Sequence, residues 1–109
     1  MNAKNEREND LDFDLEITRV RPTQMGGTWV CGTIDGEFRF DALVFAEHAE
    51  VTDYELNASR ISKLWMAKTA NKEMVFNWDR GMDIPAADNR VHSVVDFLCE
   101  GLADFVCND

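Results

Sequence analysis

The sequence predicts an α+β fold in which an antiparallel sheet of about five strands is packed by one C-terminal amphipathic helix. Large apolar residues alternate with period two over much of the first two-thirds of the chain, which is typical of strands. Near the C-terminus the period changes to 3.6 residues, which is typical of a helix. The residues at this helical spacing are Val91, Val94, Val95, Leu98, Leu102 and Phe105. Because the strands come first and a single helix follows, an antiparallel meander is the most economical arrangement.

The N-terminal part is predicted to consist of a short leader and one strand. Residues 1–10 are polar and acidic, and we expect a disordered leader there. Apolar residues then alternate strictly with polar ones over residues 11–18, which predicts a half-buried strand whose acids face water. Arg21-Pro22 and Gly26-Gly27 indicate a turn region after this strand. Residues 11–109 are expected to form a single α+β domain, since a chain of 109 residues is close to the common domain size.

The first predicted hairpin joins strands over residues 28–34 and 37–45. Asp35-Gly36 lies between them, and a two-residue Asp-Gly connection favours a type I′ turn because both of its positions need positive φ. The acidic segment 46–58 follows. We expect a loop with a short helical turn there.

The second predicted hairpin joins strands over residues 60–68 and 73–79. The turn between them needs positive φ at one position, and Asn71 is the residue expected to adopt it. Arg80-Gly81-Met82-Asp83 is expected to end the last strand.

The predicted helix begins near Pro85, because proline has no N–H and the first helical turn leaves N–H groups without partners. Asp83 and Asp88 flank this start, where a carboxylate suits the positive end of the helix dipole. The apolar periodicity extends the helix to about Val106.

The predicted strands carry large apolar residues on both faces of the sheet. Phe38 and Phe40 share one alternation, while Leu43 and Phe45 share the other. A single helix covers only one face. The segment 46–58, strong curling of the sheet or another subunit has to cover the second face, and we expect a homodimer to bury it.

The charge of the chain restricts the partners that it can have. The formal net charge is −10, and acids dominate residues 1–16, 35–57 and 83–109. Residues 60–80 reverse this, with five basic residues against two acids. An acidic protein repels polyanions at long range, so no direct nucleic-acid binding is expected. An acidic surface instead suits a basic protein partner, although solubility is its commoner role.

Other classes of site have little support in the sequence. No run of 18 apolar residues exists, so no membrane-spanning segment is expected. Cys31, Cys99 and Cys107 form an odd set without CxxC spacing, which indicates reduced thiols in a cytoplasmic protein. Glu47-His48-Ala49-Glu50 does not resemble a zinc site, and no phosphate-binding or metalloprotease motif is present. We therefore expect no metal, no cofactor and no enzymatic activity.

One patch of aromatic and basic residues stands out on the second predicted hairpin. Its members are Arg60, Lys63, Trp65, Phe76, Trp78 and Arg80. If their faces coincide, the hairpin presents indole rings flanked by cations, which stack on a base or hold an acidic group. The alternative is that the rings belong to the core and the cations are solvated, which is the commoner use of buried aromatics.

Several segments of the chain resemble a small uncharacterised bacterial family that occurs in phage, plasmid and metagenomic contexts. The segments that carry the resemblance are Phe40–Phe45, Ser59–Trp65, Val75–Gly81, Val95–Leu98 and Gly101–Asp104, and they cover most of residues 28–106. The family has no assigned activity, so the resemblance implies no catalytic residue. It favours an accessory protein of a mobile element.

Three functional hypotheses follow from the sequence. The first is a non-enzymatic, phage- or plasmid-linked protein that uses its acidic surface to engage a basic protein partner, with a nucleic-acid-mimicking inhibitor as the extreme form. The second is a small-molecule or nucleotide-binding module that uses the Trp65/Trp78 hairpin. An enzyme ranks last, because nothing in the sequence brings a nucleophile, a base and an oxyanion donor together.

Overall fold

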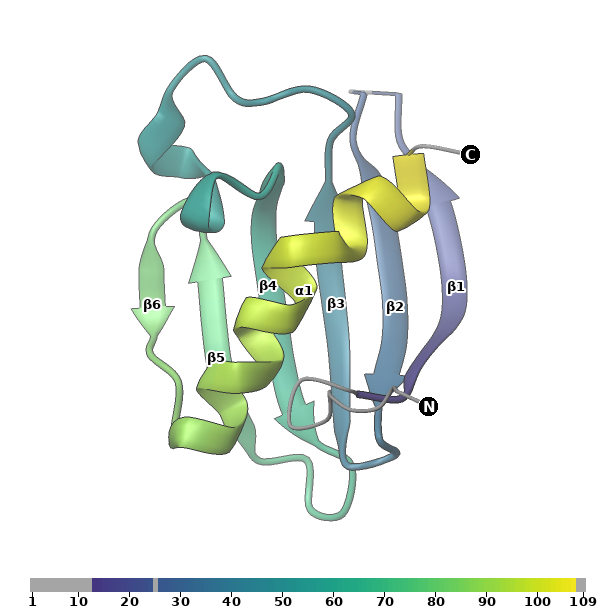
Figure 1. The fold of residues 1–109 in the computed structure, drawn as a ribbon, viewed down its shortest axis with the longest axis vertical. Coiled ribbons are helices and arrows are strands. Elements are labelled where there is room, and N and C mark those ends of the chain that lie inside the picture. Colours follow the sequence, from purple (N-terminus) through teal and green to yellow (C-terminus); the bar gives the residue numbers. More distant parts are fainter. Residues whose placement is uncertain (1–12, 25, 108–109) are drawn as a thin grey trace, which may run out of the picture.

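The structure, a computed structural model, describes residues 13–24 and 26–107. Six antiparallel strands follow one another in chain order, and a single long helix crosses one face of the sheet (Figure 1). The strands are β1 Leu15–Pro22, β2 Thr28–Ile34, β3 Phe38–Val44, β4 Ile61–Lys68, β5 Met74–Asp79 and β6 Met82–Ile84. Two 3₁₀ turns, η2 Thr52–Tyr54 and η3 Leu56–Ala58, separate β3 from β4, and the helix α1 is Asn89–Cys107. The predicted α+β fold is confirmed.

The first strand lies further along the chain than the sequence predicted. The expected leader at residues 1–10 and the first two residues of the expected strand lie outside the described residues. Within them β1 continues through Arg21 and Pro22, which were expected to form a turn and instead pair with Trp29 and Thr28. Because β1 is an edge strand, proline is tolerated there without the loss of a ladder hydrogen bond.

The residues predicted to have positive φ are correct in the first hairpin turn and wrong in the second. Asp35 and Gly36 have φ of 57° and 66°, so the predicted type I′ conformation is confirmed. In the second turn the residue with positive φ is Lys72, at 64°, and the prediction for Asn71 was wrong. Asn71 supports this turn with its side chain instead, because its Oδ1 accepts the Glu73 N–H at 2.9 Å.

A sixth strand and a later helix start also depart from the prediction. Met82–Ile84 pairs with β5, so Pro85 lies in the connection to the helix and not in its first turn. The helix begins four residues after Pro85, where Asp88 Oδ1 accepts the Val91 N–H at 2.9 Å and caps the start.

The core lies between the sheet and α1. Its largest fully buried side chains include Phe38, Phe40 and Phe76 from the sheet and Leu98 and Leu102 from the helix. The predicted helical stripe is therefore correct in its first five members, all of which are buried. Phe105 was expected to complete the stripe, but in the last turn of α1 it is 66% exposed.

The face of the sheet opposite α1 is called the open face here. Its strand residues are Glu16, Arg19, Arg21, Trp29, Cys31, Thr33, Arg39, Asp41, Leu43, Lys63, Trp65, Asn77 and Asp79. A register shift beside Val44 makes Ser62 a bulge, so Ile61 points into the core while Lys63 and Trp65 lie on the open face. Strict alternation without the bulge would have placed Ile61 on the same face as Lys63 and Trp65. No helix in the described part of the chain is long and apolar enough to span a bilayer.

Candidate functional site

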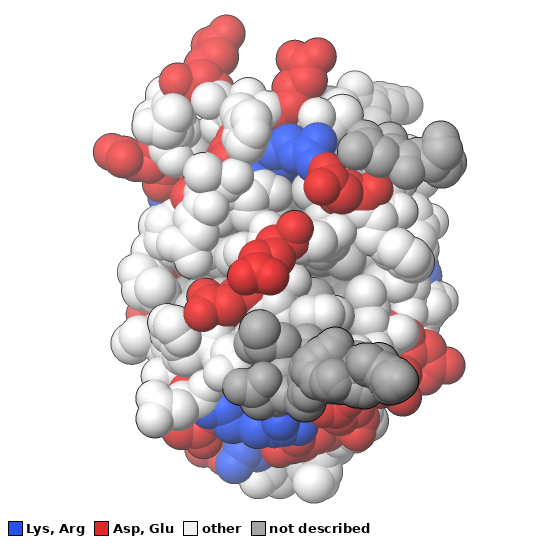
Figure 2. Space-filling view, viewed as in Figure 1, with Lys and Arg blue, Asp and Glu red and all other residues white. Residues whose placement is uncertain are grey.

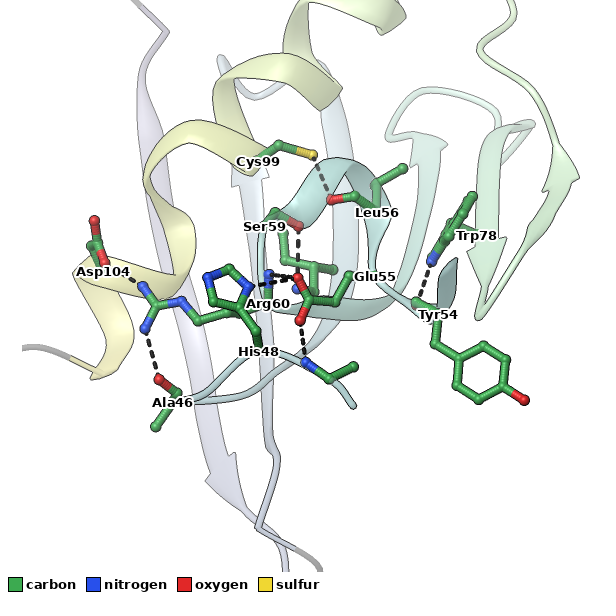
Figure 3. A network of polar contacts seen from close by, with 12 residues as sticks. Ala46, His48, Tyr54, Glu55, Leu56, Ser59, Arg60, Trp78, Cys99 and Asp104 are labelled. Atoms are coloured by element: carbon green, nitrogen blue, oxygen red, sulfur yellow. Dashed lines mark hydrogen bonds and ion pairs between the residues drawn. The ribbon is translucent and has the colours of Figure 1, made fainter. Parts of the chain in front are cut away.

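The segment 46–58 folds over the end of the sheet at which β3 ends and β4 begins. As expected, it is a loop with short helical turns. Leu56 anchors it to the core with 3% of its surface exposed. A second anchor is a hydrogen bond in which Trp78 Nε1–H donates to the Tyr54 carbonyl at 3.2 Å (Figure 3). One apolar contact with the core and one hydrogen bond to β5 therefore hold the segment in place.

The carboxylate of Glu55 is the centre of the polar network inside this segment (Figure 3). It is only 6% exposed. His48 Nδ1 lies 2.9 Å from Oε1, the Arg60 N–H donates to the same oxygen at 3.1 Å, and the Ala49 N–H donates to Oε2. Burial alone would raise the pKa of Glu55, but these hydrogen bonds outweigh it and lower the pKa below its ordinary value.

Arg60 clamps the segment to the helix. Its guanidinium donates to the Ala46 carbonyl at 2.8 Å and to the Asp104 carboxylate on α1. The backbone of this region is left-handed at three non-glycine residues, with φ of 52° at Asn57, 55° at Ala58 and 67° at Arg60. Residues with a Cβ rarely adopt this conformation, so the hydrogen bonds of Glu55 and Arg60 hold a strained turn in place.

Beside this segment lies a cavity of about 700 Å³, called the end cleft here. Its apolar lining comes from Leu43, Phe45 and Tyr54, and its charged lining includes Lys63 and Arg80. Small-molecule sites occupy roughly 300–1,000 Å³ and combine an apolar lining with a few polar groups. The end cleft has both properties.

Two cations at the mouth of the end cleft lie beside a single carboxylate. Lys63 Nζ lies 3.6 Å from Asp79 Oδ1, and Arg80 Nε lies 3.7 Å from the same oxygen. The Arg80 N–H donates to the Ser62 carbonyl at 2.9 Å, which fixes the end of β5 beside the cleft. Two cations thus share the Asp79 carboxylate, and both can offer donors to an anion that enters the cleft, although Glu47 also belongs to its lining.

The six residues of the predicted patch do not form one surface. Trp65 lies on the open face, with the Arg39 guanidinium 5.6 Å from its ring centroid. Phe76 and Trp78 lie on the opposite face, where Phe76 is buried and Trp78 packs at the margin of the core. The remaining three, Arg60, Lys63 and Arg80, line the end cleft.

Sequence reasoning missed the apolar and acidic members of this site. Leu43 and Phe45 were placed only on the alternation opposite Phe38 and Phe40, and Glu55 was one acid among many. The cleft forms because a loop without periodicity folds onto a strand end, and no local pattern in the sequence encodes that contact. The nearest indication was the cluster of cations in residues 60–80.

A smaller cavity of about 550 Å³ lies on the other side of Arg60, against α1. It contains Cys99, whose thiol is 3.8 Å from the Leu56 carbonyl. Burial raises the pKa of Cys99 to about 11, so this thiol is protonated at neutral pH and is a poor nucleophile. Among the described residues no three His, Cys, Asp or Glu side chains are grouped to hold a metal ion.

Comparison with protein families identifies most of this chain. A family model described as "Domain of unknown function (DUF7678)" matches residues 28–103, which include the end cleft residues from Leu43 to Arg80. No curated protein and no solved structure matches the chain.

Proposed function

The chain belongs to the DUF7678 family, an uncharacterised domain family to which no activity is assigned. We propose its function from the geometry of the end cleft. The protein is a non-enzymatic binding module whose end cleft takes a small organic anion. The ligand carries a carboxylate or phosphate on an apolar or aromatic body, and nucleotides belong to this class. The observation that carries the proposal is an apolar cleft whose two mouth cations share a single carboxylate.

The apolar part of the cleft suits the body of the ligand, and the basic part suits its carboxylate or phosphate. Leu43 and Phe45 offer apolar surface at the end of β3, and they leave no room for a side chain at Gly27, where an added Cβ would lie 2.9 Å from both. Arg80 presents several N–H donors in a planar group that matches carboxylate or phosphate oxygens, and Lys63 adds a point charge. Glu55 is saturated by its own donors, so it does not compete for these cations.

Isothermal titration calorimetry with aromatic carboxylates and nucleoside monophosphates tests this proposal. We expect one compound to bind with a stoichiometry of one per chain, and Arg80→Gln to weaken binding about tenfold or more, as expected for the loss of a charged hydrogen bond. Lys72→Gln is the matched control, since it removes an exposed cation in the β4–β5 turn. Equal weakening by both variants would indicate nonspecific charge attraction, and no binding at millimolar ligand would refute the proposal.

A second candidate function uses the acidic outer side of α1. Asp96, Glu100 and Asp104 follow one another at intervals of four residues, which aligns them along the helix. Figure 2 shows acidic side chains along this view of the molecule, with basic ones confined to two small areas. Such a row suits a basic protein partner, and a phage- or plasmid-linked inhibitor is the extreme form. Capture of a host protein at low salt that is lost in an Asp96→Lys/Glu100→Lys variant would favour this candidate, and capture that the variant leaves unchanged would refute it.

We also propose that the protein is cytoplasmic and homodimeric. The cytoplasmic location is supported by the free thiols of Cys31 and Cys99. The dimer is supported by the half-buried tryptophans Trp29 and Trp65 on the open face, where no helix of the described residues covers the sheet.

A further inference from the structure

The open face has a charge balance that differs from the rest of the chain. Its strands and their margin carry four basic side chains, Arg19, Arg21, Arg39 and Lys63, and four acidic ones, Glu16, Asp41, Asp79 and Asp83. The chain as a whole has a net charge of −10. A surface on which opposite charges balance lacks the self-repulsion that keeps strongly charged proteins apart.

Toward the end of β1 the two edges of the sheet carry opposite signs, whereas Glu16 lies near the start of β1. Arg19 and Arg21 lie on β1, which is one edge of the sheet. Asp79 ends β5, and Asp83 lies in β6, the other edge. Asn77 Nδ2 donates to Asp83 Oδ2 at 2.8 Å, which holds the Asp83 carboxylate toward the open face.

Aromatic and aliphatic side chains occupy the middle of the same face. Trp29, Leu43 and Trp65 are all half-buried and lie on β2, β3 and β4, between the basic and acidic edges. An apolar centre with a charged rim is the usual composition of a stable protein interface.

We propose that two copies of this chain pack through their open faces about a two-fold axis that runs parallel to the strands, midway between β3 and β4. This symmetry lays β1 of one copy over β6 of its partner, because the strands lie in chain order from β1 to β6. Arg19 and Arg21 then meet the partner's Asp83, and the arrangement occurs twice because the interface is isologous. The half-buried tryptophans lie between these two charged rims.

The area available is sufficient for a dimer of moderate affinity. Six strands about 4.8 Å apart and about seven residues long give a flat face on the order of 600 Å². Side chains that protrude from the face enlarge its accessible area toward the roughly 800 Å² per partner of a stable interface. The inference rests on the proposed homodimer, and Leu43 and Lys63 belong both to the open face and to the end cleft.

Charge reversal at the two rims tests the symmetry. The mass of the wild-type protein and of Arg21→Glu, Asp83→Arg and the double variant is measured by analytical ultracentrifugation at about 1–100 μM. We expect each single variant to raise the dimer dissociation constant about tenfold or more through like-charge repulsion, and the double variant to restore it. Lys72→Glu, which reverses an exposed charge in the β4–β5 turn, is the matched control and leaves dimerisation unchanged.

The other outcomes overturn the inference in distinguishable ways. A wild-type monomer throughout this range refutes the homodimer itself. A dimer that the single variants do not weaken, or that the double variant does not restore, refutes this interface and symmetry while leaving the homodimer intact. A monomer whose tryptophan fluorescence changes on addition of a single-stranded 20-nucleotide DNA, with the change lost in Trp65→Ala, assigns the open face to nucleic acid instead. Thermal unfolding of every variant establishes that it is folded.

Discussion

The two faces of this sheet are built from the same strands and have opposite physical characters. Phe40 and Met66 face α1 and are 1% and 0% exposed, whereas Asp41 and Trp65, their immediate neighbours in the chain, are half-buried on the open face. Side chains alternate between faces along a strand, so one residue step separates a packed core from a surface with cations and indoles. The face that α1 covers therefore governs folding, and the other face is free to carry interactions.

The largest expected effect comes from comparing the stability of two variants, each with one side chain truncated on a different face. Phe40→Ala leaves a cavity beneath α1, and we expect it to lower the free energy of unfolding by about 4 kcal/mol. Trp65→Ala removes a half-buried ring and should cost about half as much or less, measured by urea denaturation at a protein concentration at which the chain is monomeric. Equal losses would show that the open face also contributes to the core.

A smaller effect is expected at Glu55, which holds the segment that borders both faces. Glu55→Gln keeps the volume but replaces a carboxylate that accepts three hydrogen bonds, so a loss of about 2 kcal/mol at pH 7 is expected. Because the pKa of Glu55 is lowered by folding, its ionisation stabilises the protein above the unfolded pKa of about 4.3. This stabilisation is lost as the pH falls through the lower folded pKa.

The pH dependence of the free energy of unfolding distinguishes the effect of the Glu55 charge from the effect of its shape. Urea denaturation of the wild type and Glu55→Gln at pH 7 and at pH 3 should give a difference that shrinks at the lower pH. His48→Gln controls for the loss of one donor, since it leaves the backbone donors of Ala49 and Arg60 in place. A difference that stays constant with pH would show that steric changes dominate.

A still smaller effect is expected at the start of the helix that covers the core. Asp88 accepts the Val91 N–H at 2.9 Å, and replacing such a cap by alanine costs about 1 kcal/mol. Asp53→Ala, in the exposed η2 turn, removes the same charge without a helix cap and should have almost no effect. Thermal denaturation of the two variants compares them, and equal shifts would show that charge alone acts.

Features set by residues close together in the chain could be predicted from the sequence, whereas features set by long-range contacts could not. Asp35-Gly36 specifies its turn because two adjacent residues accept positive φ, and the stripe from Val91 to Leu102 specifies a helix by its spacing. The bulge at Ser62 could not be predicted, because it arises from the pairing of β4 with β3, and it moved Lys63 and Trp65 away from Ile61. The end cleft depends on contacts between β3, β5 and segment 46–58, so only its cations were predicted.

The smallest effect is expected at Phe105, where the helical spacing predicted a core residue and the structure places an exposed one. Leu98 belongs to the same helix and is 1% exposed, whereas Phe105 is 66% exposed. Phe105→Ser should change the free energy of unfolding by less than about 0.5 kcal/mol, as surface substitutions usually do, while Leu98→Ala should cost about 3 kcal/mol. Urea denaturation measures both. A large loss at Phe105 would mean that another surface covers it in solution, and the helix would then have a second buried contact beyond the sheet.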